Sequence, residues 1–305
     1  MINVGVLGKG DFSPKKLEKI NAFPSFNFIG AYDSFSWLEN FSNPISLINR
    51  SDALFIFDTE ISDYQTLKEL TRKLKHLYVH DPSRLGYDQC QQLQSLAFEA
   101  GTVIQFGYSP LYSETFETLG DEHFEAPMVE IQHTLKYSNQ GATLSLLNDL
   151  LLQDIEMACY FAKSEIKNVR ANGIGNIEEN PDQIHSRLEF FNGCVVNLNI
   201  SKMGVENRHI STLFHGNSQQ VIDHLENTIS FFEENELEEI NKTRNFHQVR
   251  KVELSDQYNF DKGLRDFLQC VELEKKPKSS LDSFINVKFI ASFIVDQVSS
   301  NFAKV

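Results

Sequence analysis

Short apolar runs alternate with amphipathic stretches in the N-terminal part of the chain. The runs that read as strands are residues 2–8, 26–33, 52–57, 76–80 and 102–106. Helical patterns lie between them, at about 62–74 and 87–100, and Ser13-Pro14 supplies an N-cap and a first-turn proline for the first helix. Mostly uncharged strands that alternate with helices predict a parallel sheet covered on both faces.

The pattern changes after about residue 126. Residues 127–137 alternate between apolar and polar, which indicates a strand with one exposed face, and residues 144–163 read as a long helix. Hairpins are indicated at Asn192-Gly193 and at residues 215–218, and two helices close the chain at 259–274 and 281–300. This part predicts an α+β domain with an open-faced antiparallel sheet.

The segment after the first strand carries the clearest chemical signal. It reads Gly8-Lys9-Gly10-Asp11-Phe12-Ser13, a G-x-G-x-x-S version of the Rossmann dinucleotide fingerprint. The first glycine permits a tight turn, the second lets the backbone approach a pyrophosphate, and Ser13 replaces the third. Asp33 ends the second strand, where a carboxylate bonds the ribose hydroxyls. We therefore expect NAD or NADP as cofactor, with NAD slightly preferred because of Asp33.

Together these patterns predict an α/β protein, with an N-terminal Rossmann-type parallel sheet and a C-terminal α+β domain. We expect a dinucleotide-binding domain over residues 1–120. Residues 121–305 would form a substrate and oligomerisation domain, with the last helices free to pack back on the first domain.

The charge of the chain narrows the choice of partners. The formal net charge is −14, which argues against nucleic acid or an anionic membrane surface as a partner. An acidic run at residues 233–239 is interpreted as a solvated loop. No window has the length of apolar sequence that a membrane helix needs, and the start of the chain has no leader pattern, so we expect a cytoplasmic protein.

Cysteine and histidine spacing gives no sign of a metal site. The four cysteines are widely spaced and contain no C-x-x-C pair, so we expect small buried thiols. No two histidines form an H-x-x-x-H or similar pair, so no metal is expected. His133 and Asp154 are considered only as side chains that line a cleft between the domains.

Six segments, in order and over nearly the whole chain, resemble the Gfo/Idh/MocA oxidoreductase family. They are the Gly8–Ser13 turn with Asp33, His80-Asp81-Pro82, residues 106–110, residues 149–156, the hairpin at 213–223 and the C-terminal helix with Lys276-Pro277. The resemblance implies that the Gly8–Ser13 turn, Asp33, Thr59 and Pro82 bind the cofactor. It places the candidate catalytic residues at Asp149, Gln153 and Asp81, with His80 as an adjacent titratable group.

Two of the three usual catalytic positions of the family are substituted. Asp81 stands at the lysine position and Gln153 at the histidine position, while Asp149 keeps its identity. Tyr64 stands where a nearby histidine is common. Gln153 cannot take a proton, and Asp81 would be a weak base unless its pKa were raised.

These departures leave three functions open. The first is an NAD(P)-dependent oxidoreductase that transfers hydride to or from a small substrate held between the domains, either sugar-like or another carbonyl, imine or enoate compound. The second is a catalytically inactive family member that binds a nucleotide or ligand. The third is a scaffold subunit. Because family members commonly dimerise through the open sheet face, the resemblance also implies a homodimer or homotetramer.

Overall fold

A computed structural model describes the chain from residue 1 to 304 with several gaps. The described residues are 1–8, 13–32, 43–58, 61–107, 109–119, 127–137, 144–175, 181–234, 246–254, 260–301 and 303–304, without the side chains of 144–149 and 303–304. The chain forms two compact units. The first comprises Met1–Tyr112 and Asn259–Lys288, and the second comprises Ser113–Tyr258 and Phe289–Val305.

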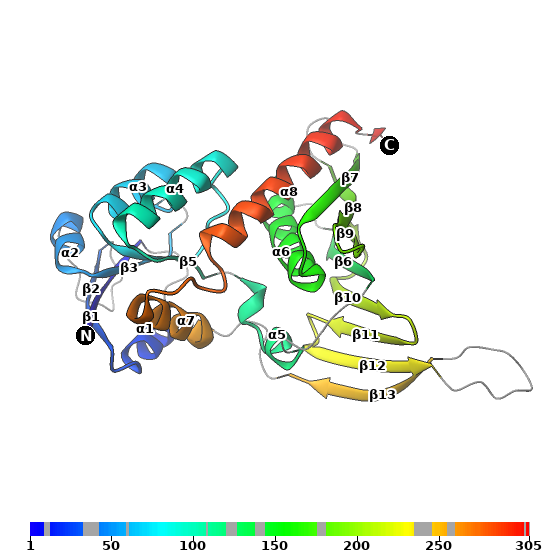
Figure 1. The fold of residues 1–305 in the computed structure, drawn as a ribbon, viewed down its shortest axis with the longest axis horizontal. Coiled ribbons are helices and arrows are strands. Elements are labelled where there is room, and N and C mark those ends of the chain that lie inside the picture. The colour runs from blue at the N-terminus through cyan, green and yellow to red at the C-terminus, as the bar shows by residue number, and fades with distance from the viewer. Residues whose placement is uncertain are drawn as a thin grey trace, which may run out of the picture. The chain divides into compact units, whose positions relative to one another are not determined.

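The first unit is built on a parallel sheet (Figure 1). Its strand order is β2-β1-β3-β4-β5, from β1 (Ile2–Leu7), β2 (Phe26–Tyr32), β3 (Ala53–Ile56), β4 (His76–Val79) and β5 (Ile104–Phe106). The helices α2 (Pro44–Arg50), α3 (Tyr64–Arg72) and α4 (Tyr87–Ala100) cover one face, and α1 (Pro14–Asn21) and α7 (Phe260–Leu273) cover the other. A short 3-10 turn, η1, spans Pro110–Tyr112. The predicted parallel sheet, covered on both faces, is confirmed.

Alternate side chains of the strands enter two separate cores, one on each face of this sheet. On the α1 and α7 face, Phe55 packs edge-to-face on Tyr78 with 5.1 Å between ring centroids, and it also contacts Phe267 of α7 at 5.6 Å. The core on the other face is aliphatic, with Leu54, Ile56 and the first turn of α8 (Leu281–Ser300). A helix from far along the chain thus completes a core that the N-terminal strands begin.

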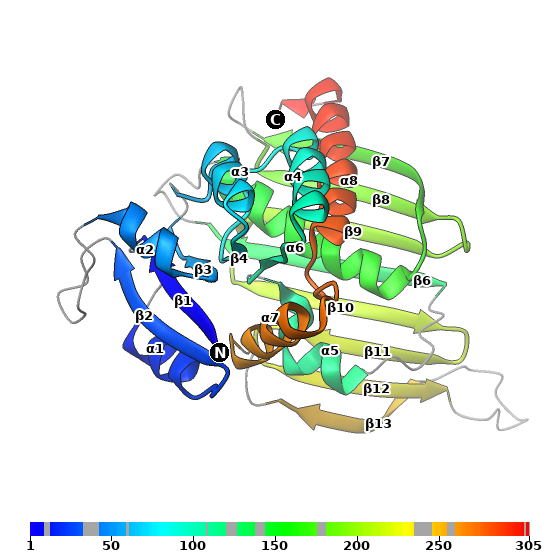
Figure 2. The same cartoon turned by 60° about the vertical axis from the view of Figure 1, so that its left-hand side comes forward.

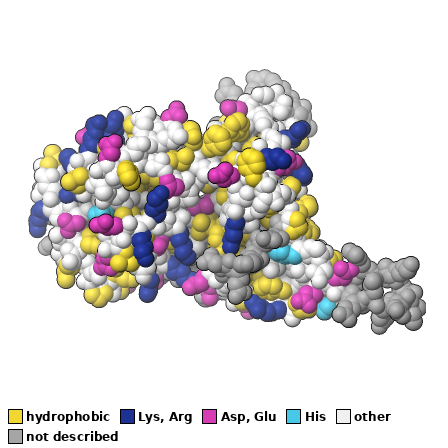
Figure 3. All heavy atoms as spheres, in the orientation of Figure 1, with side chains coloured by type: hydrophobic (Ala, Val, Ile, Leu, Met, Phe, Trp, Pro, Cys, Tyr) yellow, Lys and Arg dark blue, Asp and Glu magenta, His cyan; other side chains and the backbone are white. Residues whose placement is uncertain are grey.

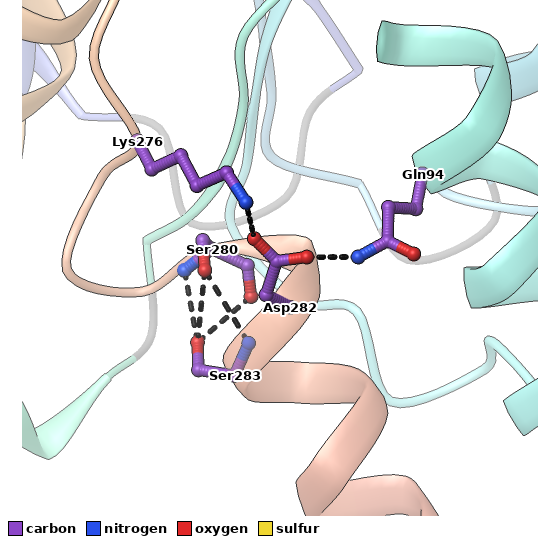
Figure 4. Close-up of polar contacts among 5 residues, drawn as sticks. All are labelled: Gln94, Lys276, Ser280, Asp282 and Ser283. Carbon is purple, nitrogen blue, oxygen red and sulfur yellow. Dashed lines mark hydrogen bonds and ion pairs between the residues drawn. The ribbon is translucent and has the colours of Figure 1, made fainter.

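The first turn of α8 is fixed by side-chain caps (Figure 4). The Ser280 hydroxyl accepts a hydrogen bond from the Ser283 amide at 3.3 Å. In return, the Ser283 hydroxyl accepts one from the Ser280 amide at 3.0 Å. Such reciprocal bonds satisfy two amides that a helix start leaves without intrahelical partners. Asp282 in the same turn bonds Gln94 of α4 and Lys276, and its negative charge suits the helix N-terminus.

The second unit is a nine-stranded sheet with helices on one face (Figure 2). Its strand order is β13-β12-β11-β10-β6-β9-β8-β7-β14. The strands are β6 (Met128–Lys136), β7 (Ile166–Gly175), β8 (Gln183–Phe190), β9 (Val195–Gly204), β10 (Arg208–His215), β11 (Ser218–Asp223), β12 (Thr228–Glu234), β13 (Phe246–Glu253) and β14 (Ala303–Lys304). All pairs are antiparallel except β6–β9 and β7–β14. The predicted C-terminal α+β domain is confirmed.

The helix α6 (Leu144–Ala162) packs on β6 and β9, and α5 (Glu114–Leu119) packs near β11. The later part of α8 is tied to β7 through the amide of Gln297. Its oxygen accepts a bond from the Ala171 amide, and its nitrogen donates to the Val169 carbonyl, both at 2.8 Å. The Gln297 side chain therefore makes the backbone hydrogen bonds that a neighbouring strand would make with this part of β7.

Several elements differ from the sequence-based expectation. The acidic run does not begin as a loop, because Glu233 and Glu234 end strand β12 and pair with β13. Residues 235–239 lie outside the described residues.

The four cysteines are free thiols, and burial raises the pKa of Cys90 and Cys159 to about 12. No helix in the described part of the chain is long and apolar enough to cross a membrane.

Candidate functional site

The carboxyl edge of the parallel sheet holds most of the described candidate residues of the first unit. The register pairs Leu7 with Ile56, Ile56 with Val79 and Val79 with Phe106. The residues that follow these strand ends are therefore neighbours along one edge, about 4.8 Å from strand to strand. They are Gly8, Phe57, His80 and Gly107. In open α/β sheets, ligands bind at this edge.

Gly8 is required by the local geometry of the chain. Its φ is +85°, and a Cβ at this position would lie 2.2 Å from the Cβ of Asp58. Any side chain would therefore be both strained and in collision with the end of β3. A tight turn of this kind is what the first glycine of a dinucleotide fingerprint supplies.

Ser13 caps the helix that follows. Its hydroxyl accepts a hydrogen bond from the Lys16 amide at 3.4 Å, and Pro14 occupies the first turn, as predicted. The free N–H groups at such a helix start can bind an anion. Lys16 also places its ammonium over the Phe57 and Phe260 rings, at 5.0 and 5.4 Å from their centroids. Lys9, Gly10, Asp11, Phe12, Asp33 and Thr59, which were also predicted to bind the cofactor, lie outside the described residues.

The predicted pair His80 and Asp81 sits after β4. The His80 ring packs against Phe57 with 5.4 Å between ring centroids. The Asp81 carboxylate accepts a hydrogen bond from the Ser83 amide at 2.8 Å and so caps the turn that contains buried Pro82. The two adjacent side chains therefore have different partners, an aromatic ring for His80 and a backbone amide for Asp81.

The remaining candidates lie on α6 of the second unit. Asp149 and Gln153 are four residues apart, so they share one face of this helix. The side chain of Asp149 is not among the described ones, while Gln153 is buried, with 8% of its surface exposed. The next residue, Asp154, is on the side of α6 that faces the sheet.

Asp154 forms a buried cluster with two histidines. Its carboxylate lies 3.2 Å from Nδ1 of His133 on β6 and 3.0 Å from Nε2 of His209 on β10. Burial alone would raise the pKa of Asp154, but the two histidines bring it to about 2. The His133 and His209 rings stack with 3.7 Å between centroids. His133 and Asp154, considered above as side chains that line a cleft, are thus buried against each other inside the second unit.

A third histidine extends this row. The His224 ring centroid lies 4.4 Å from that of His209, and Nε2 of His224 bonds the Ser211 hydroxyl at 2.8 Å. Burial and the neighbouring His209 lower the pKa of His224 well below its ordinary value.

The opposite face of the same sheet is polar and hollowed. A depression of about 560 Å³ is lined by side chains from β6 to β9, among them Glu130, Gln132, Arg170, His185, Arg187 and Asn199. Charges of both signs occur there, as they do across the molecular face in Figure 3.

No family model matches the chain. The UDP-N-acetylglucosamine 3-dehydrogenase of Acidithiobacillus ferrooxidans is 20% identical over 188 residues, which are 61% of this chain and 60% of that relative. The crystal structure of this dehydrogenase, GnnA, superimposes with a TM-score of 0.82 at 17% identity and covers 98% of both chains.

Two further structures agree over nearly the full length. The Clostridium difficile dehydrogenase MviM has a TM-score of 0.80 at 17% identity, covering 97% of this chain and 99% of that one. KijD10, a 3-ketoreductase from Actinomadura kijaniata in complex with TDP-benzene and NADP, has a TM-score of 0.74 at 16% identity and covers 100% and 98%. The chain has the Gfo/Idh/MocA-type dehydrogenase fold. The resemblance that the sequence motifs predicted is confirmed at this level, and identities this low establish the fold alone.

Within this fold, sequence reasoning missed the cluster around Asp154. Its members come from three elements, and their separations in sequence are 21 and 55 residues. One signal was present: His133 follows Val129 and Ile131 at alternate positions, and His209 precedes Ser211 and Leu213 in the same way. Because alternate residues of a strand point to the same face, this spacing places both histidines on the inner face of the sheet.

Proposed function

We propose that this chain is a nicotinamide-dependent oxidoreductase that acts on a sugar-like substrate. The observation that carries the proposal is the full-length agreement with the dehydrogenase fold, together with the tight approach of Gly8 to Asp58 at the carboxyl edge of the parallel sheet. The three similar structures are a dehydrogenase of a sugar nucleotide, a further dehydrogenase and a 3-ketoreductase.

The first unit fits a dinucleotide at the start of α1. The tight turn at Gly8 leads the chain from β1 toward α1, and the N-terminus of α1, capped by Ser13, offers donors to the oxygens of a pyrophosphate. Pro82 and Thr59 are proposed to contact the same cofactor. When bound there, a nicotinamide supplies the hydride acceptor or donor. Asp33 favours NAD by bonding the ribose hydroxyls and opposing a 2′-phosphate.

The second unit supplies the polar groups of the reaction. We assign Asp149 as the group that accepts the hydroxyl proton and Gln153 as a hydrogen-bond partner of the substrate, because the two share one face of α6. His80 is the alternative base. Asp81 has a weaker claim, since its carboxylate already caps the Ser83 amide.

Calorimetric titration with the oxidised and reduced forms of NAD and NADP tests the cofactor. We expect micromolar affinity for one pair, and Asp33→Asn should raise the relative affinity for the phosphorylated pair. Turnover is then followed by reduced-nicotinamide absorbance with UDP-N-acetylglucosamine and related nucleotide sugars. Asp149→Asn should abolish turnover while cofactor affinity is kept. The proposal fails if no nicotinamide form binds at millimolar concentration.

A second candidate is a family member that binds ligand without turnover. It is favoured by Gln153, which cannot take a proton, and by the engagement of Asp81 in a turn. Binding of cofactor and nucleotide sugar with no absorbance change over hours would support it. Any measurable turnover that Asp149→Asn abolishes would exclude it.

We also propose that two copies associate through the polar face of the nine-stranded sheet. Arg170 and Arg187 lie on this face with Glu130, so the same patch on a second copy, turned by a two-fold axis, can pair opposite charges. Light scattering at micromolar concentration should give twice the chain mass. Arg187→Glu should shift it to the single-chain mass, and a single-chain mass for the unchanged protein contradicts the proposal.

A further inference from the structure

The first two turns of α8 are fixed to the first unit by several side chains. Phe284 packs on Phe106 at the end of β5, with 4.7 Å between ring centroids, and Asp282 bonds Gln94 of α4 (Figure 4). One turn beyond Phe284, the ammonium of Lys288 lies 5.3 Å from the centre of the Phe284 ring. These contacts determine which groups of the first unit the Lys288 ammonium can reach.

Lys288 donates a hydrogen bond to the turn that follows β4. Its Nζ lies 2.7 Å from the carbonyl oxygen of Ser83, which is 205 residues away in the sequence. The amide of Ser83 bonds the Asp81 carboxylate at 2.8 Å, and the Leu85 amide bonds the Pro82 carbonyl at 3.0 Å. The turn is therefore held from within by its own hydrogen bonds and from outside by α8.

The surroundings of the Lys288 ammonium are unfavourable for a charge. Lys288 is half-buried, beside the aliphatic core that contains Cys90 of α4. Burial raises the pKa of the Cys90 thiol, and the nearby charge of Lys288 opposes that rise. An ammonium at the margin of an apolar core loses part of its hydration and needs an acceptor in exchange, which the Ser83 carbonyl supplies. Because an apolar side chain could fill the same space without this cost, we interpret Lys288 through the turn that it bonds.

The strand order indicates which part of a dinucleotide would reach this turn. Strand β1 lies between β2 and β3, and β4 is next to β3. In the cofactor site proposed above, Asp33 after β2 bonds the adenosine ribose, and the start of α1 after β1 binds the pyrophosphate. The nicotinamide half would then extend away from Asp33, over the ends of β3 and β4. The turn that Lys288 bonds follows β4 directly, so it belongs to that end of the cofactor site.

We propose that Lys288 is a positioning residue for the nicotinamide half of the cofactor. It acts through the backbone of the turn from His80 to Ser83 and does not itself touch the cofactor. The inference rests on the proposed nicotinamide-dependent function and adds a residue of the C-terminal helix to that site. Without the Lys288 bond, the turn keeps its internal hydrogen bonds but loses its tie to α8. Small movements matter there, because a displacement of about 1 Å at a reacting centre can cost about 100-fold in rate.

The first measurement is hydrogen exchange of the full-length protein without any cofactor. Lys288→Met removes the ammonium and keeps a long unbranched side chain over Phe284. We expect peptides that contain the amides of Ser83 and Leu85 to exchange faster in this variant, whereas peptides of β1 keep their rate. Because no ligand is present, the result reports on the support of the turn whether or not a nicotinamide binds.

The second measurement separates positioning from a general loss of structure. The reduced nicotinamide cofactor that the unchanged protein binds is titrated by calorimetry beside the matching ADP-ribose, which lacks the nicotinamide ring. We expect Lys288→Met to weaken binding of the cofactor by about 10-fold, the equivalent of one hydrogen bond. The affinity for ADP-ribose should stay the same, because its contacts lie at the ends of β1 and β2.

Two further variants complete the test. Lys278→Met is the matched control, since Lys278 is an exposed lysine of the same unit, and it should keep the exchange rates and both affinities of the unchanged protein. Lys288→Ala, which favours a helix, is a second way to remove the ammonium and should show the same selective loss as Lys288→Met. Circular dichroism establishes that each variant is folded.

Two results would overturn the assignment of Lys288. One is an unchanged exchange rate of the turn in the folded Lys288 variants, because the turn would then not depend on this residue. The other is an equal change in affinity for the cofactor and ADP-ribose, or no change in either. If the unchanged protein binds no nicotinamide form, the proposed function fails and this inference fails with it. That outcome is distinguishable, because it is seen before any variant is compared.

Discussion

At the scale of single residues, two of the glycines with positive φ, Gly8 and Gly101, allow the cost of backbone strain to be distinguished from the cost of a steric clash. Gly8 has φ +85° and its added Cβ would meet Asp58, whereas Gly101 has φ +62° with nothing within 4 Å of an added Cβ. Both glycines have a left-handed backbone, but only at Gly8 would an added Cβ collide with a neighbouring residue. A pair of alanine substitutions can therefore measure what the close approach at the turn costs.

We predict that Gly8→Ala lowers the free energy of unfolding by about 2–4 kcal/mol, the sum of a left-handed backbone and an overpacked contact. Gly101→Ala should cost about 1 kcal/mol, from the backbone alone. Urea denaturation of both variants gives the two values. Equal losses would show that the contact with Asp58 relaxes freely.

His224 makes a second prediction, on pH. Because its pKa is lowered in the folded chain, the unfolded state binds more protons as pH falls below about 6.5, and stability is lost in that range. Asp154, His133 and His209 are the titratable groups that act on it. His224→Gln keeps a donor near the Ser211 hydroxyl and removes the titration.

Lowering the pH from 7 to 5.5 should therefore cost the unchanged protein up to about 1 kcal/mol more than His224→Gln. Urea unfolding at the two pH values measures the difference. His185→Gln serves as control and should retain the slope of the unchanged protein. A His224→Gln variant with the same slope would mean that His224 is protonated in the fold.

At the scale of elements, most helices and strands could be predicted because local signals mark their ends. Ser13-Pro14 starts α1 and Asn192-Gly193 turns β8 into β9, and the bounds expected for α4 and α8 match the structure. The strands β12 and β13 were not predicted. The end of β12 lies in the acidic run, and β13 is an exposed edge strand without alternating buried positions. The His133–Asp154–His209 cluster could not be predicted either, because it depends on a register between distant strands.

The cap of α3 gives a prediction at this scale. The Asp63 carboxylate accepts bonds from the Gln65 amide at 2.9 Å, the Thr66 amide at 3.2 Å and the Thr66 hydroxyl at 2.6 Å. Asp63→Ala should lower the free energy of unfolding by about 1 kcal/mol. Asp63→Asn, which still accepts from the amides, should cost less. Thermal or urea unfolding of the two variants checks the order, and equal losses would assign the effect to charge rather than to capping.

At the scale of the whole molecule, the proposed cofactor would act on the first unit. A ligand that binds only the folded state stabilises it by about 2.7 kcal/mol at a concentration one hundred times its Kd. Cofactor should therefore protect the amides of β1 and β3 from hydrogen exchange more than those of β6 and β10. Exchange measured with and without cofactor tests this, and equal added protection in both units would contradict the assignment.

The way the first unit is assembled also has a consequence for its synthesis. Phe55 and Tyr78 are buried by α7, which belongs to a stretch that the ribosome delivers only after residue 259. Until α7 is synthesised, one apolar face of the nascent parallel sheet stays exposed to solvent. The N-terminal strands therefore cannot complete their core while the intervening unit is being synthesised. Chaperones that shield such faces are expected to hold the unfinished chain, and stalled translation before α7 should release an aggregating fragment.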